Sequence, residues 1–144
     1  MEVVEFANKI EAIDLKNALS NSELKGIFKQ DNYFLFREDV FLIIKVSRNK
    51  IKPFYGMGKK FFDLFSKLTE SKGTFYFVGL VSNSSGWVLS KKQLTSLIST
   101  RSLSMSSDQR EYKINSHNLR DQDSFRTVEG FLSKIGIPGV LPVK

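Results

Sequence analysis

The chain has 144 residues, one histidine, no cysteine and a net charge of +7. This length suits one domain, which needs no disulfide or metal for stability, and the lack of cysteine and of a second histidine leads us to expect no metal and no cofactor. Because no apolar run reaches the roughly 18–20 residues of a membrane span and the first residues hold no signal-peptide core, we expect a cytoplasmic protein with no membrane partner.

The positive charge is concentrated in the middle of the chain. Residues 1–39 contain 5 basic and 8 acidic side chains, residues 40–107 contain 11 and 2, and residues 108–144 contain 6 and 5. A solvated surface normally mixes the two signs, whereas a block of one sign is typical of a site for a polyanion.

The first third of the chain predicts a helix followed by a hairpin. Apolar residues at near-helical spacing predict an amphipathic helix over residues 5–19, and residues 23–30 are expected to start a strand. Residues 31–39 indicate a turn, a strand and a turn, and the apolar run 40–46 predicts a strand buried on both faces, paired with the first across Glu38-Asp39.

The basic middle predicts two strand–loop–helix units. Pro53 and two glycines predict a loop over residues 47–58, before a helix over residues 59–68. Residues 74–90 predict a hairpin with a polar turn, and Ser90 with Gln93 forms a capping-box pattern at the start of a second helix. The two units share an order of strand, polar loop, Lys-Lys and helix, which predicts two similar loops leaving one sheet.

The last third predicts shorter elements. A serine-rich loop over residues 99–110 precedes a strand over residues 111–115 and a short helix within residues 124–136. We interpret residues 1–136 as a single domain, and residues 137–144 as a linker or the cut edge of the chain.

Basic side chains follow the buried strand, and no acid lies between residues 40 and 62. Two lysine pairs also fall in predicted first helical turns, where a cation opposes the helix dipole by about 0.3–1 kcal/mol. A phosphate docked on the free N–H groups of such a helix start would offset that cost. The residues predicted to bind phosphate are Lys45, Lys50, Lys52, Lys59, Lys60, Lys91 and Lys92.

Aromatic side chains accompany these charges. Phe54, Tyr55 and Trp87 lie in or beside the predicted loops, where they would stack on bases or pack at the nucleic acid. Packing in the core is the simpler interpretation of an aromatic residue, since the chain has 13 phenylalanines. Binding of RNA or of a single strand through these residues stays open as an alternative.

A catalytic alternative rests on Glu111 and Lys113. Glu-x-Lys on a strand resembles half of the active site of PD-(D/E)xK nucleases, but the Asp expected some 10–30 residues earlier is missing, because residues 71–107 contain no acid. One carboxylate makes a poor magnesium site. The segment GMGKK lacks the spacing of a phosphate-binding P-loop, and nothing pairs with His117 as a general base, so we expect a non-catalytic domain.

The segments KPFYGMGKK, SNSSGWVLSKK and YKI resemble the DNA-binding pseudobarrel of the B-three type, in its restriction-endonuclease branch. Within that branch the chain is most similar to the N-terminal domains of LlaJI-type, McrB-like restriction subunits. The resemblance implies an α+β fold, a β-rich open pseudobarrel of mixed strands with flanking helices. It covers most of residues 24–135, although a long helical insert after each arm departs from the family and leaves the strand order open.

The resemblance also implies two arms that enter the major groove of double-stranded DNA and read its sequence. Arg pairs with guanine and Asn with adenine, while lysines hold phosphates and fix the register. The partners implied are double-stranded DNA and further domains or subunits of a restriction complex. The positions that correspond to the base-reading arms are Ser47, Arg48 and Asn49 in the first, and Ser82, Asn83, Ser84 and Ser85 in the second.

Overall fold

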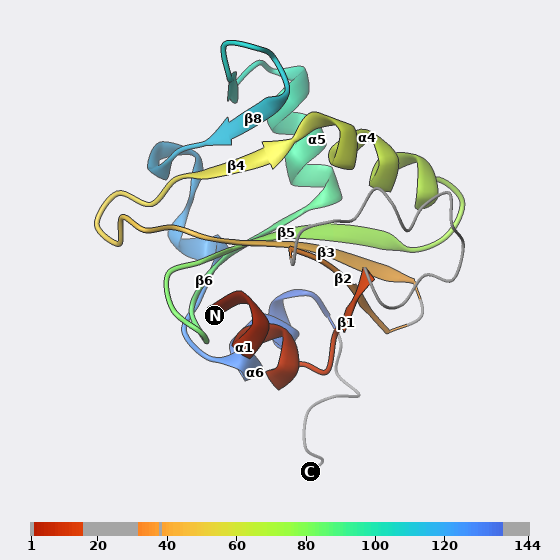
Figure 1. Ribbon diagram of the computed structural model, residues 1–144, viewed down its shortest axis with the longest axis vertical. Helices are drawn as coiled ribbons and strands as arrows, with labels where there is room; N and C mark the ends of the chain where they lie inside the picture. The colour runs from red at the N-terminus through yellow and green to blue at the C-terminus, as the bar shows by residue number, and fades with distance from the viewer. Residues whose placement is uncertain (1, 16–31, 38, 137–144) are drawn as a thin grey trace.

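A computed structural model describes residues 2–15, 32–37 and 39–136 (Figure 1). In these residues the fold is α+β, with strands gathered into a large mixed sheet and a small second sheet, and helices packed on both sides. The large sheet is open and does not close into a barrel. The resemblance implied an α+β fold, a β-rich open pseudobarrel of mixed strands with flanking helices; the α+β class, the open arrangement of mixed strands and the flanking helices are confirmed.

Within the described residues the large sheet contains six strands in the order β1-β2-β3-β5-β6-β9. Among these strands β3 and β5 run parallel, and the other neighbours are antiparallel. The central strand β3 is apolar along most of its length because both faces of the sheet are covered, and Leu42, Ile43 and Ile44 are fully buried. The strands are β1 (Ile13–Asp14), β2 (Tyr33–Phe36), β3 (Val40–Val46), β5 (Thr74–Leu80), β6 (Gly86–Ser90) and β9 (Ser124–Phe125).

The small sheet contains β4 (Tyr55–Gly58), β8 (Glu111–Ile114) and β7 (Ser104–Met105), in the order β4-β8-β7. The predicted loop over residues 47–58 was thus too long, because its last four residues form β4. Two glycines hide this strand in the sequence, yet Tyr55 and Met57 alternate with them and are buried. The serine-rich segment, predicted as a loop, likewise contains the short strand β7.

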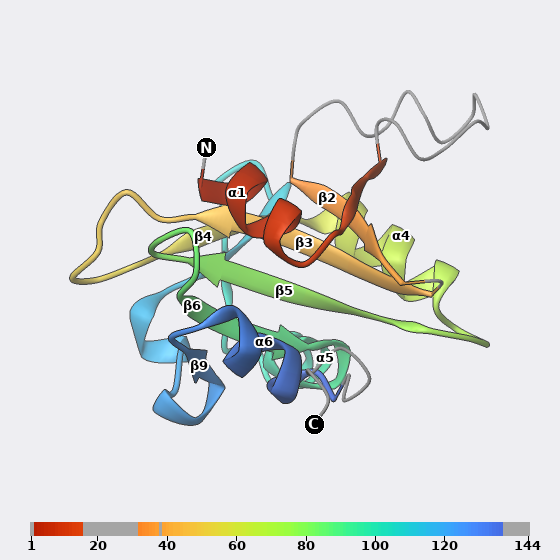
Figure 2. The same cartoon turned by 90° about the horizontal axis from the view of Figure 1, so that it is seen from below.

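Two hydrophobic cores lie on opposite faces of the large sheet (Figures 1 and 2). One face is covered by α1 (Glu2–Lys9) and α6 (Val128–Lys134), whose Phe6 and Phe131 rings meet edge to face at 5.0 Å. The other face is covered by α4 (Lys59–Leu68), α5 (Lys91–Ser99) and the small sheet. Each core is therefore closed by elements from distant parts of the chain.

Some helix boundaries in the structure differ from those that the local sequence pattern predicts. The helix predicted over residues 5–19 is α1, which begins at Glu2 and ends at Lys9, because Glu11 adopts a left-handed backbone (φ 59°) before β1. The capping box of Ser90 and Gln93 is confirmed at the start of α5. The end of that predicted helix, residues 16–19, and the predictions for residues 23–30 and 137–144 lie outside the described residues. In the part of the chain that the structure describes, no helix is long and apolar enough to cross a bilayer.

Candidate nucleic-acid interface

Two loops leave the large sheet side by side. Because β3 and β5 are parallel and in register, with Val46 opposite Leu80, their carboxyl ends lie next to each other. The first loop (residues 47–54) continues from β3 into β4, and the second loop (residues 81–85) joins β5 to β6. Both project from the same end of the molecule, at the left of Figure 1 and again of Figure 2. Two loops do leave one sheet, as predicted, but they are not similar, because the first leads into the small sheet and the second joins two strands of the large sheet.

The backbone carbonyl of Leu80 anchors both stems of the first loop. It accepts a hydrogen bond from the Ser47 backbone N–H at 3.0 Å and another from the Tyr55 hydroxyl at 2.9 Å. Gly79 leaves space for the Tyr55 ring, since a Cβ at that glycine would lie 2.6 Å from the ring. Leu80 is also the last residue of β5, so the first loop is held directly beside the point where the second loop begins.

Tyr55 therefore lies in the core, where its ring meets Phe77 edge to face, and its side chain is 2% exposed. Burial also raises the pKa of its hydroxyl, as expected for a phenol held away from water. The sequence placed this residue in the loop as a stacking candidate. In the structure its described contacts hold the loop in place.

The first loop is tied together by its own polar side chains. Ser47 is buried, and its hydroxyl donates to the carbonyl of Asn49 at 2.8 Å and accepts from the N–H of Phe54 at 3.3 Å. The Lys50 ammonium donates to the Ser47 carbonyl at 2.8 Å. Ser47, predicted to read bases, thus closes the base of the loop with its hydroxyl.

Asn49 shapes the tip of the first loop. Its side-chain oxygen accepts hydrogen bonds from the backbone N–H groups of Ile51 and Lys52, at 3.0 and 2.9 Å. This local pattern is a common way for asparagine to stabilise a turn. The arrangement leaves the side chains of Arg48, Ile51 and Lys52 exposed at the tip.

The second loop is held by contacts within itself and with α1. The hydroxyls of Ser82 and Ser85 lie 2.6 Å apart, and the Ser84 N–H donates to Ser82 Oγ at 3.2 Å. The Asn83 amide donates to the Glu5 carboxylate at 3.3 Å, and the Lys9 ammonium approaches the Asn83 carbonyl at 3.5 Å. The Asn83 contacts are exposed, so the amide of this residue can exchange its partner for a ligand.

Trp87, the other proposed stacking residue, follows the second loop in β6. It is partly buried and pairs across the sheet with Gly79. Phe54, in contrast, is 58% exposed at the end of the first loop. Of the three aromatic candidates, the structure exposes Phe54 most.

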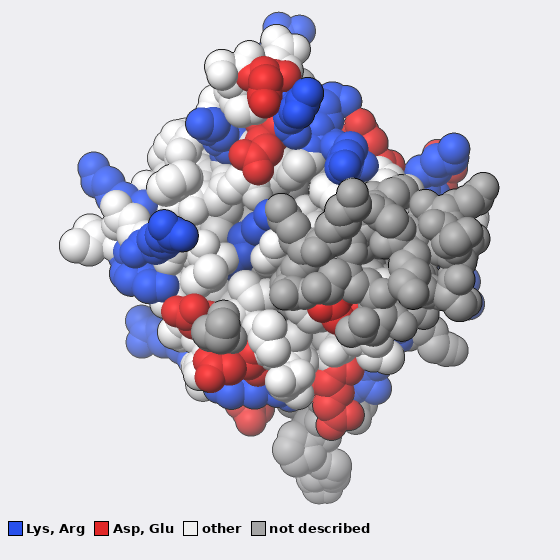
Figure 3. Space-filling view, in the orientation of Figure 1, with Lys and Arg blue, Asp and Glu red and all other residues white. Residues whose placement is uncertain are grey.

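The two loops differ in the charged side chains that surround them. Basic side chains gather at the left edge of Figure 3, over the first loop, and acidic ones lie below them over α1. The first loop carries Arg48, Lys50 and Lys52 and no carboxylate. Beside the second loop, Lys9 and Arg126 line a recess together with Ser84 and Glu129. Sequence reasoning did not find Lys9 and Arg126, because both lie far along the chain from this loop.

The lysine pair at the start of α4 has partners within the protein. The Lys59 ammonium pairs with Asp63 one turn later at 2.9 Å, a hydrogen bond that raises the pKa of Lys59. The Lys60 ammonium lies 5.1 Å from the ring centre of Phe61. These contacts reduce the unfavourable interaction between the two lysines and the helix dipole at the start of α4. A bound phosphate is therefore no longer needed to explain why lysines occur there.

Lys91 and Lys45 are also engaged in internal contacts. The Lys91 ammonium donates to the carbonyl and hydroxyl of Thr69, the residue that caps the carboxyl end of α4, where the helix dipole favours a cation. Lys45 lies 5.7 Å from the ring centre of Tyr33, and burial lowers its pKa while the charge of Glu111 acts in the opposite direction. Lys92 is exposed at the start of α5.

The residues of the nuclease alternative lie on β8. Glu111 and Lys113 are exposed on one face of this strand, and the Glu111 carboxylate lies over Gly56, where a Cβ would be 2.7 Å from its oxygen. His117 is exposed in the short helix η1 (Ser116–Asn118). Within the described ranges, no group of three or more His, Cys, Asp or Glu side chains is placed to hold a metal ion.

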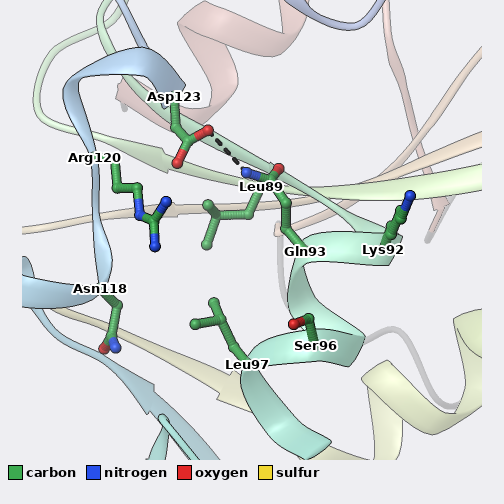
Figure 4. A pocket seen from close by; sticks show the side chains of 8 residues that line it. All are labelled: Leu89, Lys92, Gln93, Ser96, Leu97, Asn118, Arg120 and Asp123. Atoms are coloured by element: carbon green, nitrogen blue, oxygen red, sulfur yellow. Dashed lines mark hydrogen bonds between the residues drawn. The ribbon is translucent and has the colours of Figure 1, made fainter. Parts of the chain in front are cut away.

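A separate recess of about 310 Å³ lies between α5 and the segment formed by η1 and η2 (Asp121–Asp123) (Figure 4). Gln93 has two roles there: its side chain closes the capping box, and its Nε2 donates to the buried Asp123 carboxylate at 2.8 Å. Arg120 and Lys92 add two exposed cations to the lining. The recess adjoins Leu89, near the end of β6 away from the second loop, so it does not form one surface with the loops.

No family model, no curated protein and no solved structure matches this chain. The interpretation of the loops therefore rests on their geometry and charge.

Proposed function

We propose that this chain is a sequence-specific double-stranded DNA-binding domain, the non-catalytic recognition module of a restriction-modification system. One observation carries the proposal. Two loops leave the carboxyl ends of adjacent parallel strands, the stems of the first are bonded to the carbonyl of Leu80, after which the second begins, and the first loop exposes three cations without a carboxylate. Rigid projections that carry charge and polar groups suit the grooves of a duplex, which admit protein elements about as wide as a helix or a two-stranded ribbon.

The two loops would divide the work of recognition. Arg48 and Lys52 extend from the first loop to phosphates and to guanine, while Lys50 already bonds the loop backbone and adds its charge to the same surface. Asn83 on the second loop would exchange Glu5 for the edge of an adenine. Lys9 and Arg126 would contact the phosphates beside it.

Salt titration of duplex affinity tests the electrostatic part of the proposal. If these five cations each neutralise one phosphate, log K falls against log salt with a slope of about −4.5, and affinity drops on the order of 500-fold between 50 and 200 mM salt. Fluorescence anisotropy with a random-sequence duplex measures the slope. A flat salt response would refute binding to any polyanion.

Competition and selection test the choice of nucleic acid. We expect duplex DNA to displace the labelled duplex better than single strands or RNA of the same length, and selection from random duplexes to enrich one short site. Preference for RNA or single strands would overturn the duplex assignment. Cleavage of the duplex by this chain with magnesium would instead support the nuclease alternative based on Glu111 and Lys113.

A further inference from the structure

Ile51 at the tip of the first loop is the most exposed large apolar side chain in the described residues, with an exposed fraction of 91%. We propose that this side chain is a wedge, which enters the base stack of the duplex when the first loop docks. The proposal rests on the proposed function and adds to it a mode of binding: the protein locally unstacks and bends its DNA.

The structure holds the wedge in an extended position. The Ile51 backbone N–H is bound by the side chain of Asn49, and both stems of the loop are fixed on the Leu80 carbonyl. Isoleucine also has few side-chain conformations because it is branched at Cβ. A wedge has to resist being pushed back by the stack, and this loop meets that requirement better than an unconstrained loop of the same length.

The surroundings of Ile51 match the cross-section of a duplex. Lys50 and Lys52 flank it along the chain, and Arg48 lies nearby in the same loop. An apolar tip between cations complements a partner that has an apolar interior between two rows of negative charge. In DNA these are the stacked bases and the two phosphate backbones, and apolar wedges such as isoleucine are a known means of kinking a base step.

An anionic membrane has the same two properties, but the second loop argues against it. Asn83, its partner Glu5 and the Ser82 hydroxyl lie at the same end of the molecule. Docking this end on a bilayer would desolvate the amide and the hydroxyl in the acyl region without giving them partners. In a groove, the amide and hydroxyl find base edges.

The proposed wedge also leads to a prediction of which base step of the duplex is unstacked. Pyrimidine–purine steps unstack most easily, so the preferred site should contain such a step beneath Ile51. Phe54 is half exposed on the same loop, in position to pack against the sugar next to the opened step. The affinity of the protein should therefore rise for duplexes that carry a mismatch at that step.

The experiment places 2-aminopurine at successive positions of the selected duplex and measures its fluorescence with and without protein. We expect the wild type to raise the fluorescence severalfold at one step, as unstacking does, and Ile51→Ala to abolish the rise. The variant should bind about 10-fold more weakly with an unchanged salt slope, because every cation remains. Leu68→Ala is the matched control, since Leu68 is 40% exposed at the end of α4 and should leave both readings unchanged.

The outcomes separate the wedge from the proposed function. Duplex binding without a change in 2-aminopurine fluorescence, or with a change that Ile51→Ala retains, overturns the wedge and leaves the proposed function intact. Failure to bind any duplex overturns both. If vesicles with phosphatidylserine bind in an Ile51-dependent manner and duplexes do not, the tip is a membrane anchor and the proposal is wrong. Ile51→Val should keep most of the signal, because it retains a branched apolar side chain.

Discussion

The first and second loops start from neighbouring strands but differ in what holds them. The first is closed by its own side chains, Ser47, Asn49 and Lys50, and by the anchor on Leu80. The second is shorter and is also tied by its own serines, but its Asn83 amide donates an exposed hydrogen bond to Glu5 of α1. The first therefore keeps its shape without a ligand, whereas the second can exchange an internal partner for an external one.

This contrast assigns different tasks to the loops. A preorganised basic loop contributes affinity, because it loses little further conformational entropy on binding. A polar loop whose amide has an internal carboxylate partner contributes selectivity, because only a ligand that matches the amide will displace that partner. The following variants test this division, beginning with the largest expected effect.

Removing the three cations of the first loop should weaken duplex binding most. We expect Arg48→Ala, Lys50→Ala and Lys52→Ala together to lower affinity about 100-fold at 100 mM salt and to flatten the salt slope by about 2.7, from three lost phosphate contacts. The control removes the same charge elsewhere, with Lys67→Ala, Lys72→Ala and Arg101→Ala, all exposed. Equal losses in both triple variants would show that net charge, and not the first loop, sets affinity.

Gly79→Ala should damage the anchor of the first loop. The new Cβ would lie 2.6 Å from the buried Tyr55 ring, and such overpacking typically lowers the free energy of unfolding by about 1–3 kcal/mol. Urea denaturation measures the loss. Gly56→Ala is the matched control in β4, because its Cβ would meet only the movable carboxylate of Glu111, and we expect a change within about 0.5 kcal/mol.

Tyr55→Phe should loosen the first loop with a smaller loss of stability. It removes one of two hydrogen bonds to the Leu80 carbonyl, worth about 1 kcal/mol. Tyr76→Phe is the control, because the Tyr76 hydroxyl makes only a long contact of 3.4 Å with Ile135. A loss no larger in Tyr55→Phe than in Tyr76→Phe would contradict the anchoring role.

The same hydroxyl predicts a dependence on pH. Because burial raises the pKa of Tyr55 in the folded protein, the unfolded chain releases the phenolic proton first, above the ordinary pKa of 10.0. The stabilisation is thus complete below pH 10 and is lost as the pH rises from there towards the folded pKa. Wild-type unfolding free energy should fall over this range, and Tyr55→Phe should fall less steeply.

Asn83→Ala should have the smallest effect on stability, within about 0.5 kcal/mol, since its contacts are exposed. It should relax base preference at one or two positions and leave the salt slope unchanged. Arg48→Ala should relax different positions, and the double variant should be near additive. Selection from random duplexes with each variant measures this. If both variants relax the same positions, the two loops do not divide the site.

The sequence predicted elements whose signal is local. The apolar run of β3, the spaced phenylalanines of α4 and the capping box at Ser90 each depend on nearby residues, and all three are confirmed. The pattern at Tyr55–Gly58 was missed because glycine carries no strand signal, and only pairing with β8 makes this segment a strand.

The candidate site depended on contacts that no local pattern shows. The tie between Lys91 and Thr69 spans 22 residues, and the one between Asn83 and Glu5 spans 78. Charge patterning located the basic loop but did not distinguish lysines with internal partners, such as Lys59, from those at the tip. That distinction required the packing of α4 and α5.

Because both stems of the first loop are bonded to Leu80, the segment between them can be replaced by other sequences. Its stems are fixed by the Ser47 N–H and by the Tyr55 side chain, so the bonds that define the opening do not involve the side chains of Arg48 or Ile51. Segments of other sequence and length could be grafted between these two points while the sheet and its two cores stay as they are. Protection of the Ser47 amide from hydrogen exchange would then report whether each graft keeps the hydrogen bond to Leu80.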